Sequence, residues 1–216
     1  MPAPYSLQLF SASLPPPLWL PLAAVVGVAL DRLLGEAKRW HPLVGFGVLT
    51  NAVESAFNRG PRRRARGILA WSLLVLPCVT FVLWARPGNV LGWAMDASLL
   101  YLALGGRSLG EHASRVADDL AAGNLGAARQ HVGWMVSRET SELDEAGVAK
   151  ACIESTLENG NDAIFGALFW FALLGGAGAL LFRLSNTLDE TAARVFKLSA
   201  GPQRGWTMRS TIARRA

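Results

Sequence analysis

Four long apolar runs alternate with polar segments along the chain. They cover residues 14–30, 67–84, 90–104 and 163–182. Since a helix rises about 1.5 Å per residue, each run is long enough, or nearly so, to cross ~30 Å of hydrocarbon. The run 90–104 is the weakest because it is short and contains Asp96, whose charge costs roughly 3 kcal/mol at mid-bilayer. We predict an all-α, polytopic membrane protein in which Asp96 turns toward protein or water.

Composition supports this class. Of the 216 residues 51% are hydrophobic and only 17% charged, which is too apolar for an ordinary soluble domain. The two cysteines, Cys78 and Cys152, exclude a disulfide framework and a thiolate metal cluster. No Lys or Arg precedes the first apolar run, so we interpret that run as a retained anchor rather than a cleaved signal.

Basic residues are concentrated between the first two apolar runs. Residues 31–66 hold eight basic and three acidic side chains, including the run 61–66. Nucleic-acid binding is one interpretation, but no interleaved aromatic residues accompany the run. A short Arg-rich loop beside a span more often stays cytoplasmic and meets anionic lipid. This orientation places the amino terminus and residues 86–89 outside and residues 105–162 in the cytoplasm.

The segment 105–162 is the expected cytoplasmic part, with ten acidic and five basic residues. Gly and Asn at 122–124 predict a break between two helices. Residues 141–144, Ser-Glu-Leu-Asp, resemble a capping box that opens the next helix. No alternating apolar pattern or internal repeat is present, so helices are expected throughout.

The glycines at 175–178 interrupt the fourth apolar run. If residues 163–182 crossed fully, the seven basic and two acidic residues of 183–216 would lie outside, against the positive-inside rule. A break or re-entrant turn at the glycines would return Asn186 and Asp189 to the cytoplasmic face. A glycine-rich helix-packing interface is the alternative.

Three acids precede this run at four-residue spacing: Glu154, Glu158 and Asp162. On a helix they share one face, where like charges repel unless a cation or a positive substrate group neutralises them. A hard ion such as Mg²⁺ takes oxygen ligands of this kind. A solvated acidic helix face is the alternative.

Several short motifs in order resemble the CobD/CbiB family of adenosylcobinamide-phosphate synthases. The resemblance covers about residues 20–190. The matching segments are Leu30–Gly35, His41–Val44, Gly106–Leu109, Ser137–Ser141, Ile153–Ser155 with Glu158, Asn159 and Asp162, Leu168–Trp170, and Asn186–Asp189.

The resemblance implies a multi-pass enzyme of the bacterial inner membrane in cobalamin biosynthesis. Such an enzyme joins adenosylcobyric acid to aminopropanol phosphate, or to a related amino alcohol, with ATP and Mg²⁺. A carboxylate reacts with an amine only after activation, so ATP would form an acyl phosphate. The implied partners are the corrinoid, the amino-alcohol phosphate, membrane lipid and other membrane enzymes of the pathway, with no nucleic acid. No Walker-type loop is present, so ATP would bind without one.

Within this resemblance the candidate residues take roles. Glu154, Glu158 and Asp162 are expected to hold Mg²⁺ and to serve catalysis. Arg138 is expected to clamp phosphate through its planar fork, and Glu139 to be the base that deprotonates the attacking ammonium. Substrate contacts are assigned to Asn159, Asn186, Asp189, His41 and Arg107. The alternatives are a surface Arg–Glu pair at 138–139, a turn residue at His41 and a helix-end anchor at Arg107.

The chain departs from the family pattern at several positions. Glu139 stands where Asp is usual, Ala163 replaces a Gly and Ala167 a Pro. Family members are about a hundred residues longer, so residues 1–190 are expected to form the membrane domain, and 191–216 a divergent basic tail of a truncated chain. A non-catalytic membrane protein, such as a transporter fragment or a sensor-like relative, is the competing hypothesis, and a structural protein on the lipid surface is a third.

Overall fold

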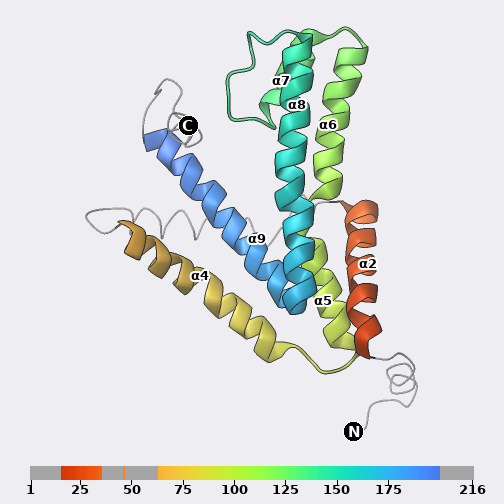
Figure 1. Cartoon of the computed structure of the whole chain (residues 1–216), viewed down its shortest axis with the longest axis vertical. Helices are drawn as coiled ribbons and strands as arrows, with labels where there is room; N and C mark the ends of the chain where they lie inside the picture. The colour runs from red at the N-terminus through yellow and green to blue at the C-terminus, as the bar shows by residue number, and fades with distance from the viewer. Residues whose placement is uncertain (1–15, 36–45, 47–62, 200–216) are drawn as a thin grey trace, which may run out of the picture.

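The computed structural model of the chain describes residues 16–35, 46 and 63–199. Within these ranges every regular element is a helix and no strand occurs, which confirms the all-α prediction. The helices are α2 (Pro16–Leu34), α4 (Arg63–Ala85), α5 (Val90–Ala103), α6 (Gly106–Ala121), α7 (Leu125–Gly133), α8 (Glu145–Gly160), the π-helix η1 (Asn161–Gly166) and α9 (Ala167–Ser199) (Figure 1).

The helices pack in two groups, each around its own core. Helices α6, α7 and α8 lie together at one end of the molecule, and α2, α4, α5 and the start of α9 lie toward the other (Figure 1). The first core contains Val116, Ala128, Val132, Val148, Ala151 and Cys152. The second contains Ala23, Ala97, Leu100, Ala103, Leu104, Ala167, Phe171 and Ala179. The many alanines of the second core allow its helices to approach closely, as is typical of helices packed in membranes.

Helix α9 reverses its direction at Gly175. This residue has φ 63° and ψ −151°, a backbone conformation that L side chains rarely adopt. After the reversal, Gly178 lies against the Trp170 carbonyl and Phe182 lies against Gly166, so two antiparallel arms form a helical hairpin. The predicted break at the glycines is confirmed. The packing interpretation holds as well, because Gly176, against Asp96 and Leu99 of α5, and Gly178 have no room for a Cβ atom.

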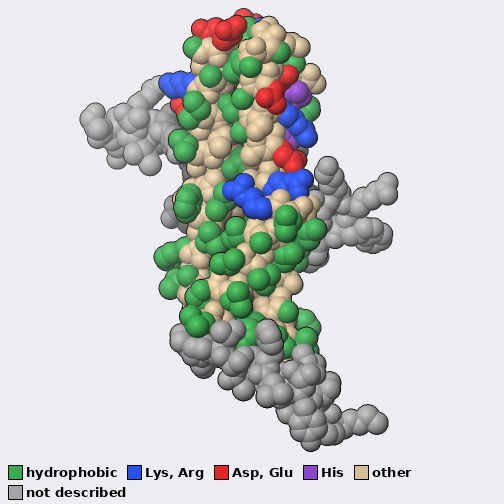
Figure 2. Space-filling model, turned by 90° about the vertical axis from the view of Figure 1, so that its right-hand side faces the viewer, with side chains coloured by type: hydrophobic (Ala, Val, Ile, Leu, Met, Phe, Trp, Pro, Cys, Tyr) green, Lys and Arg blue, Asp and Glu red, His purple; other side chains and the backbone are tan. Residues whose placement is uncertain are grey.

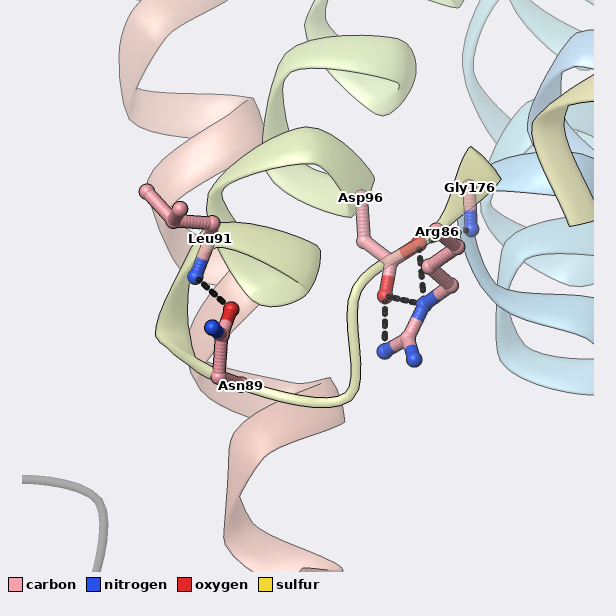
Figure 3. A network of polar contacts seen from close by, with 5 residues as sticks. All are labelled: Arg86, Asn89, Leu91, Asp96 and Gly176. Atoms are coloured by element: carbon pink, nitrogen blue, oxygen red, sulfur yellow. Dashed lines mark hydrogen bonds and ion pairs between the residues drawn. The ribbon is translucent and has the colours of Figure 1, made fainter. Parts of the chain in front are cut away.

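The buried carboxylate of Asp96 holds this reversal in place (Figure 3). Asp96 is 2% exposed, and its two oxygens accept hydrogen bonds from Arg86 at 2.8–3.2 Å. Its Oδ1 also accepts from the backbone N–H of Gly176 at 3.2 Å, the first residue after the reversal. Asp96 therefore turns toward protein, as predicted, and caps the second arm of α9 from a different helix.

The turn before α8 corrects one sequence-based expectation. The N-cap of α8 is Asp144, whose Oδ1 accepts from the Gly147 N–H at 2.8 Å. Ser141 lies in the preceding turn, so the predicted capping box at 141–144 is wrong in its capping residue. Asp144, three residues after the expected cap Ser141, captures the N–H because it directly precedes the first helical residue.

The described residues have features of a membrane protein. Two helical stretches are long and apolar enough to cross a membrane, Gly67–Ala85 and part of Glu145–Asp189. At 14 residues, α5 reaches only about 21 Å. On the face shown in Figure 2, apolar side chains dominate the lower half, acidic side chains lie in the upper half, and most Lys and Arg gather between them. A polytopic topology and the side on which 105–162 lies stay predictions.

Candidate functional site

The loop between α7 and α8 brings two predicted site residues together. Arg138 Nη2 donates to Glu154 Oε2 at 3.0 Å, and Lys150 Nζ lies 3.8 Å from the other oxygen of Glu154. The side chains of Arg138 and Glu154 are each about half exposed, at 51% and 50%. An exposed pair of this kind contributes less than about 1 kcal/mol to stability, so both groups can exchange partners for a ligand at small cost.

Hydrogen bonds at both ends fix this loop against the helices. Ser155 Oγ on α8 donates to the Met135 carbonyl at 2.7 Å, and Asn159 Nδ2 donates to Ser155 Oγ at 2.9 Å. At the other end, Thr140 Oγ1 donates to the Arg129 carbonyl at 3.0 Å. The predicted ligand-orienting residue Asn159 thus supports the loop that carries Arg138.

The predicted base Glu139 folds back on its own loop. Its Oε1 accepts from the N–H groups of Thr140 at 3.2 Å and Ser141 at 3.3 Å. The Ser141 N–H, the Ser141 hydroxyl and the Thr140 N–H stabilise the anion and lower the pKa of Glu139 below its ordinary value. A carboxylate with a lowered pKa is a weaker base, so this geometry suits loop stabilisation better than proton abstraction.

The three acids expected to bind Mg²⁺ do not form a closed metal site. Among the described residues, no three His, Cys, Asp or Glu side chains gather closely enough to hold an ion. Glu158 follows Glu154 by one turn of α8, and Asp162 lies in η1, where its Oδ1 accepts from Asn161. One or two carboxylates of this face fit a Mg²⁺ whose remaining ligands are phosphate oxygens and water.

Comparison with known proteins identifies the family. A family model described as CobD/Cbib protein matches residues 24–193. The chain belongs to the CobD/CbiB family. Proteins named "Cobalamin biosynthesis protein CobD" are 54% identical in Chromobacterium violaceum, with 80% of this chain and 56% of the relative covered, and 53% identical in Stutzerimonas stutzeri, with 78% and 56% covered. The relative in Halalkalibacterium halodurans is 38% identical, with 78% and 55% covered.

The family members that match are longer than this chain. The chain spans about 56% of the length of the relatives in Chromobacterium violaceum and Stutzerimonas stutzeri. No solved structure matches it. The family model and the named relatives confirm the resemblance to the CobD/CbiB family.

Other residues assigned from the CobD/CbiB resemblance lie away from Arg138. Arg107 sits at the start of α6 and donates to the carbonyls of Arg32 and Leu33, which makes it an anchor between two helix ends. Asn186 and Asp189 lie on the second arm of α9, the arm that packs on α4 through the Trp71–Ser185 hydrogen bond. Substrate contacts by these three residues stay predictions, and His41 lies outside the described residues.

A polar pair not expected from the sequence lies on the same helical unit. The His131 ring on α7 contacts the Asp119 carboxylate on α6 and packs edge-on against Trp134 at 4.7 Å between ring centroids. The two residues are twelve positions apart and flank the helix break at 122–124. The break predicts that the two helices are neighbours, but nothing in the sequence specifies which side chains face each other.

Proposed function

We propose that this chain acts in cobalamin biosynthesis as a membrane enzyme of the inner membrane. In the proposed reaction, ATP activates the carboxylate of adenosylcobyric acid, and the amine of aminopropanol phosphate, or of aminopropanol, forms the amide of adenosylcobinamide phosphate. Membership in the CobD/CbiB family and the printed names of the relatives support this role.

The observation that carries the proposal is the Arg138–Glu154 pair. A guanidinium and a carboxylate meet on an exposed surface, and the loop that carries Arg138 is pinned to α8 through Ser155. The planar fork of Arg138 suits two phosphate oxygens, which would replace the carboxylate oxygen of Glu154. Glu154 is then released to face the phosphates together with Glu158.

Mg²⁺ is the ion that this arrangement accommodates. When bound, it would neutralise charge on the nucleotide phosphates. Glu154 and Glu158, with Asp162 one further turn along, are the side chains that would hold it, and Asn159 would position the loop beneath. Glu139 would serve the reaction through its negative charge near the ammonium group of the amino alcohol.

The competing role is a non-catalytic membrane protein with a permeation path through Asp96. In the structure the Asp96 carboxylate is buried and bonded to Arg86 and Gly176, an arrangement typical of a structural ion pair. Because Asp96, the one acid inside an apolar run, has a structural role, the enzyme is favoured over a permeation path.

The test is amide formation by the chain purified in detergent. Adenosylcobyric acid, aminopropanol phosphate, ATP and Mg²⁺ are supplied, and both the corrinoid amide and ADP are measured. Arg138→Lys should lower kcat/KM for ATP about tenfold or more, because a point charge does not replace a bidentate fork. The matched control is Arg115→Lys on the exposed face of α6. ADP release that does not depend on the corrinoid, with no amide formed, would contradict the proposal.

A further inference from the structure

The Asp119–His131 pair fixes the protonation pattern of one imidazole. His131 Nδ1 contacts Asp119 Oδ2, and the two side chains are about one quarter and one fifth exposed, at 26% and 21%. An ionised carboxylate only accepts hydrogen bonds, so the proton of the neutral imidazole resides on Nδ1. The other ring nitrogen, Nε2, then carries a lone pair.

Aromatic packing fixes the orientation of the same ring. Trp134 meets His131 edge-on at 4.7 Å with an interplanar angle of 65°. His112 on α6 also lies edge-on to Trp134, at 6.3 Å and 87°. The imidazole of His131 is thus held between a carboxylate and an indole, which is how a positioned general base is built. Among the described residues, Asp119 and His112, both on α6, are titratable groups that contact this aromatic cluster.

His131 of the Asp119–His131 pair lies close in the chain to Arg138 of the Arg138–Glu154 pair. Trp134 follows α7 directly, and Arg138 is four residues further along. Four residues span at most about 14 Å between alpha carbons. Between them, the Met135 carbonyl is bonded to Ser155 on α8, so the connecting chain is tied to the helix that carries Glu154.

We propose that His131, oriented by Asp119, is the general base that deprotonates the amine in the amide-forming step. This inference rests on the proposed function. The substrate ammonium gives one proton to His131 Nε2, and the nitrogen lone pair attacks the acyl-phosphate carbon. The C–N bond forms, the C–O bond to phosphate breaks, and the phosphate leaves with a second proton from the nitrogen. The imidazolium then releases its proton to water.

His131 suits this step better than Glu139 does. The Glu139 carboxylate is engaged by two N–H groups of its own loop, which stabilise its anion and weaken it as a base. Imidazole is the side chain most often used as a general base.

The kinetic test compares two histidines that contact the same tryptophan. His131→Gln should lower kcat for amide formation by about 100-fold or more, with little change in KM for ATP. It should also abolish the loss of rate that protonation of the base causes at acidic pH. His112→Gln is the matched control and should keep the wild-type rate and pH profile. Asp119→Asn, paired with Asp118→Asn as its control on α6, should lower kcat through the orientation of the ring. A wild-type rate and pH profile in His131→Gln would overturn the proposal.

A binding test separates this inference from the proposed function. The chain has three histidines, so selective ¹⁵N-histidine labelling gives few ring signals, and His131→Gln assigns those of residue 131. Titration with aminopropanol phosphate should shift the His131 Nε2 signal and leave that of His112 nearly unchanged. Binding of the compound without a shift at His131 overturns the inference alone. No amide formation and no binding of aminopropanol phosphate by the folded wild-type chain overturns the proposed function and, with it, the inference.

Discussion

Asp31 and Arg107 cap each other's helices. The Asp31 carboxylate, near the end of α2 and 4% exposed, accepts from the Arg107 backbone N–H at the start of α6, at 3.1 Å. The Arg107 side chain in turn donates to the last carbonyls of α2, at 2.6 Å for Leu33. Each residue satisfies helix-end groups that would otherwise lack partners. This reciprocal contact joins the apolar group of helices to the unit α6–α8.

Removing the Asp31 carboxylate should destabilise the junction. Asp31→Ala leaves the partly buried Arg107 N–H without its acceptor, which costs about 1–3 kcal/mol. The loss is measured as a lower midpoint of unfolding in detergent. Asp118→Ala, at an exposed position of α6, is the control and should change the free energy of unfolding by less than about 0.5 kcal/mol. Equal midpoints for the two variants would contradict the capping role.

Breaking the ion pair of Asp96 should be more costly. Asp96→Ala leaves Arg86 without its partner and the Gly176 N–H without its acceptor, and loss of one member of a buried pair costs about 3–5 kcal/mol. Because Arg86 is 28% exposed and reaches solvent, we expect the lower end of that range. Unfolding in detergent measures the loss. Arg86→Gln should cost at least as much as Asp96→Ala, since it leaves the 2% exposed Asp96 carboxylate without a cation, whereas Arg86 left alone can reach solvent.

A side chain at Gly175 should oppose the reversal of α9. Gly175→Ala forces an alanine into a conformation with φ 63° and ψ −151° that is nearly restricted to glycine, at a cost of about 1–3 kcal/mol. The matched control is Gly110→Ala inside α6, where a Cβ meets nothing within 4 Å. That control should raise stability by about 0.5–1 kcal/mol because alanine favours the helix. Changes of the same sign in both variants would mean that the reversal does not depend on the glycine.

Glu139 should make stability depend on acidic pH. Its pKa is lowered below the ordinary value of 4.5 in the folded chain, so the folded state binds protons less readily than the unfolded state does. The stabilisation is therefore fully present above pH 4.5 and is lost as the pH falls through the folded-state pKa. The difference in unfolding midpoint between wild type and Glu139→Gln should be present at neutral pH and vanish in acid. Ser141→Ala should reduce this difference, because the Ser141 hydroxyl stabilises the anion.

The candidate site shows which of its features short sequence motifs can predict. Short matches to the CobD/CbiB pattern single out Arg138, the spacing of three acids together with the same matches singles out Glu154, and the structure brings the two side chains to 3.0 Å. Their pairing depends on how the 134–144 loop returns to α8, which the local sequence does not specify. Arg107 was assigned to substrate by the same matches, and its contacts with Arg32 and Leu33 are visible only once α2 meets α6.

The sequence by itself determined the helical class, the apolar runs, the break at the glycines and the family. These properties follow from local hydrophobicity, from backbone freedom at glycine and from residues in fixed order. Only the tertiary structure decided three contacts between distant residues. Asp31 meets Arg107 across 76 positions, Asp96 meets Gly176 across 80, and His131 meets Asp119 across 12. Those contacts depend on the packing angles of whole helices, and no short window of sequence carries that information.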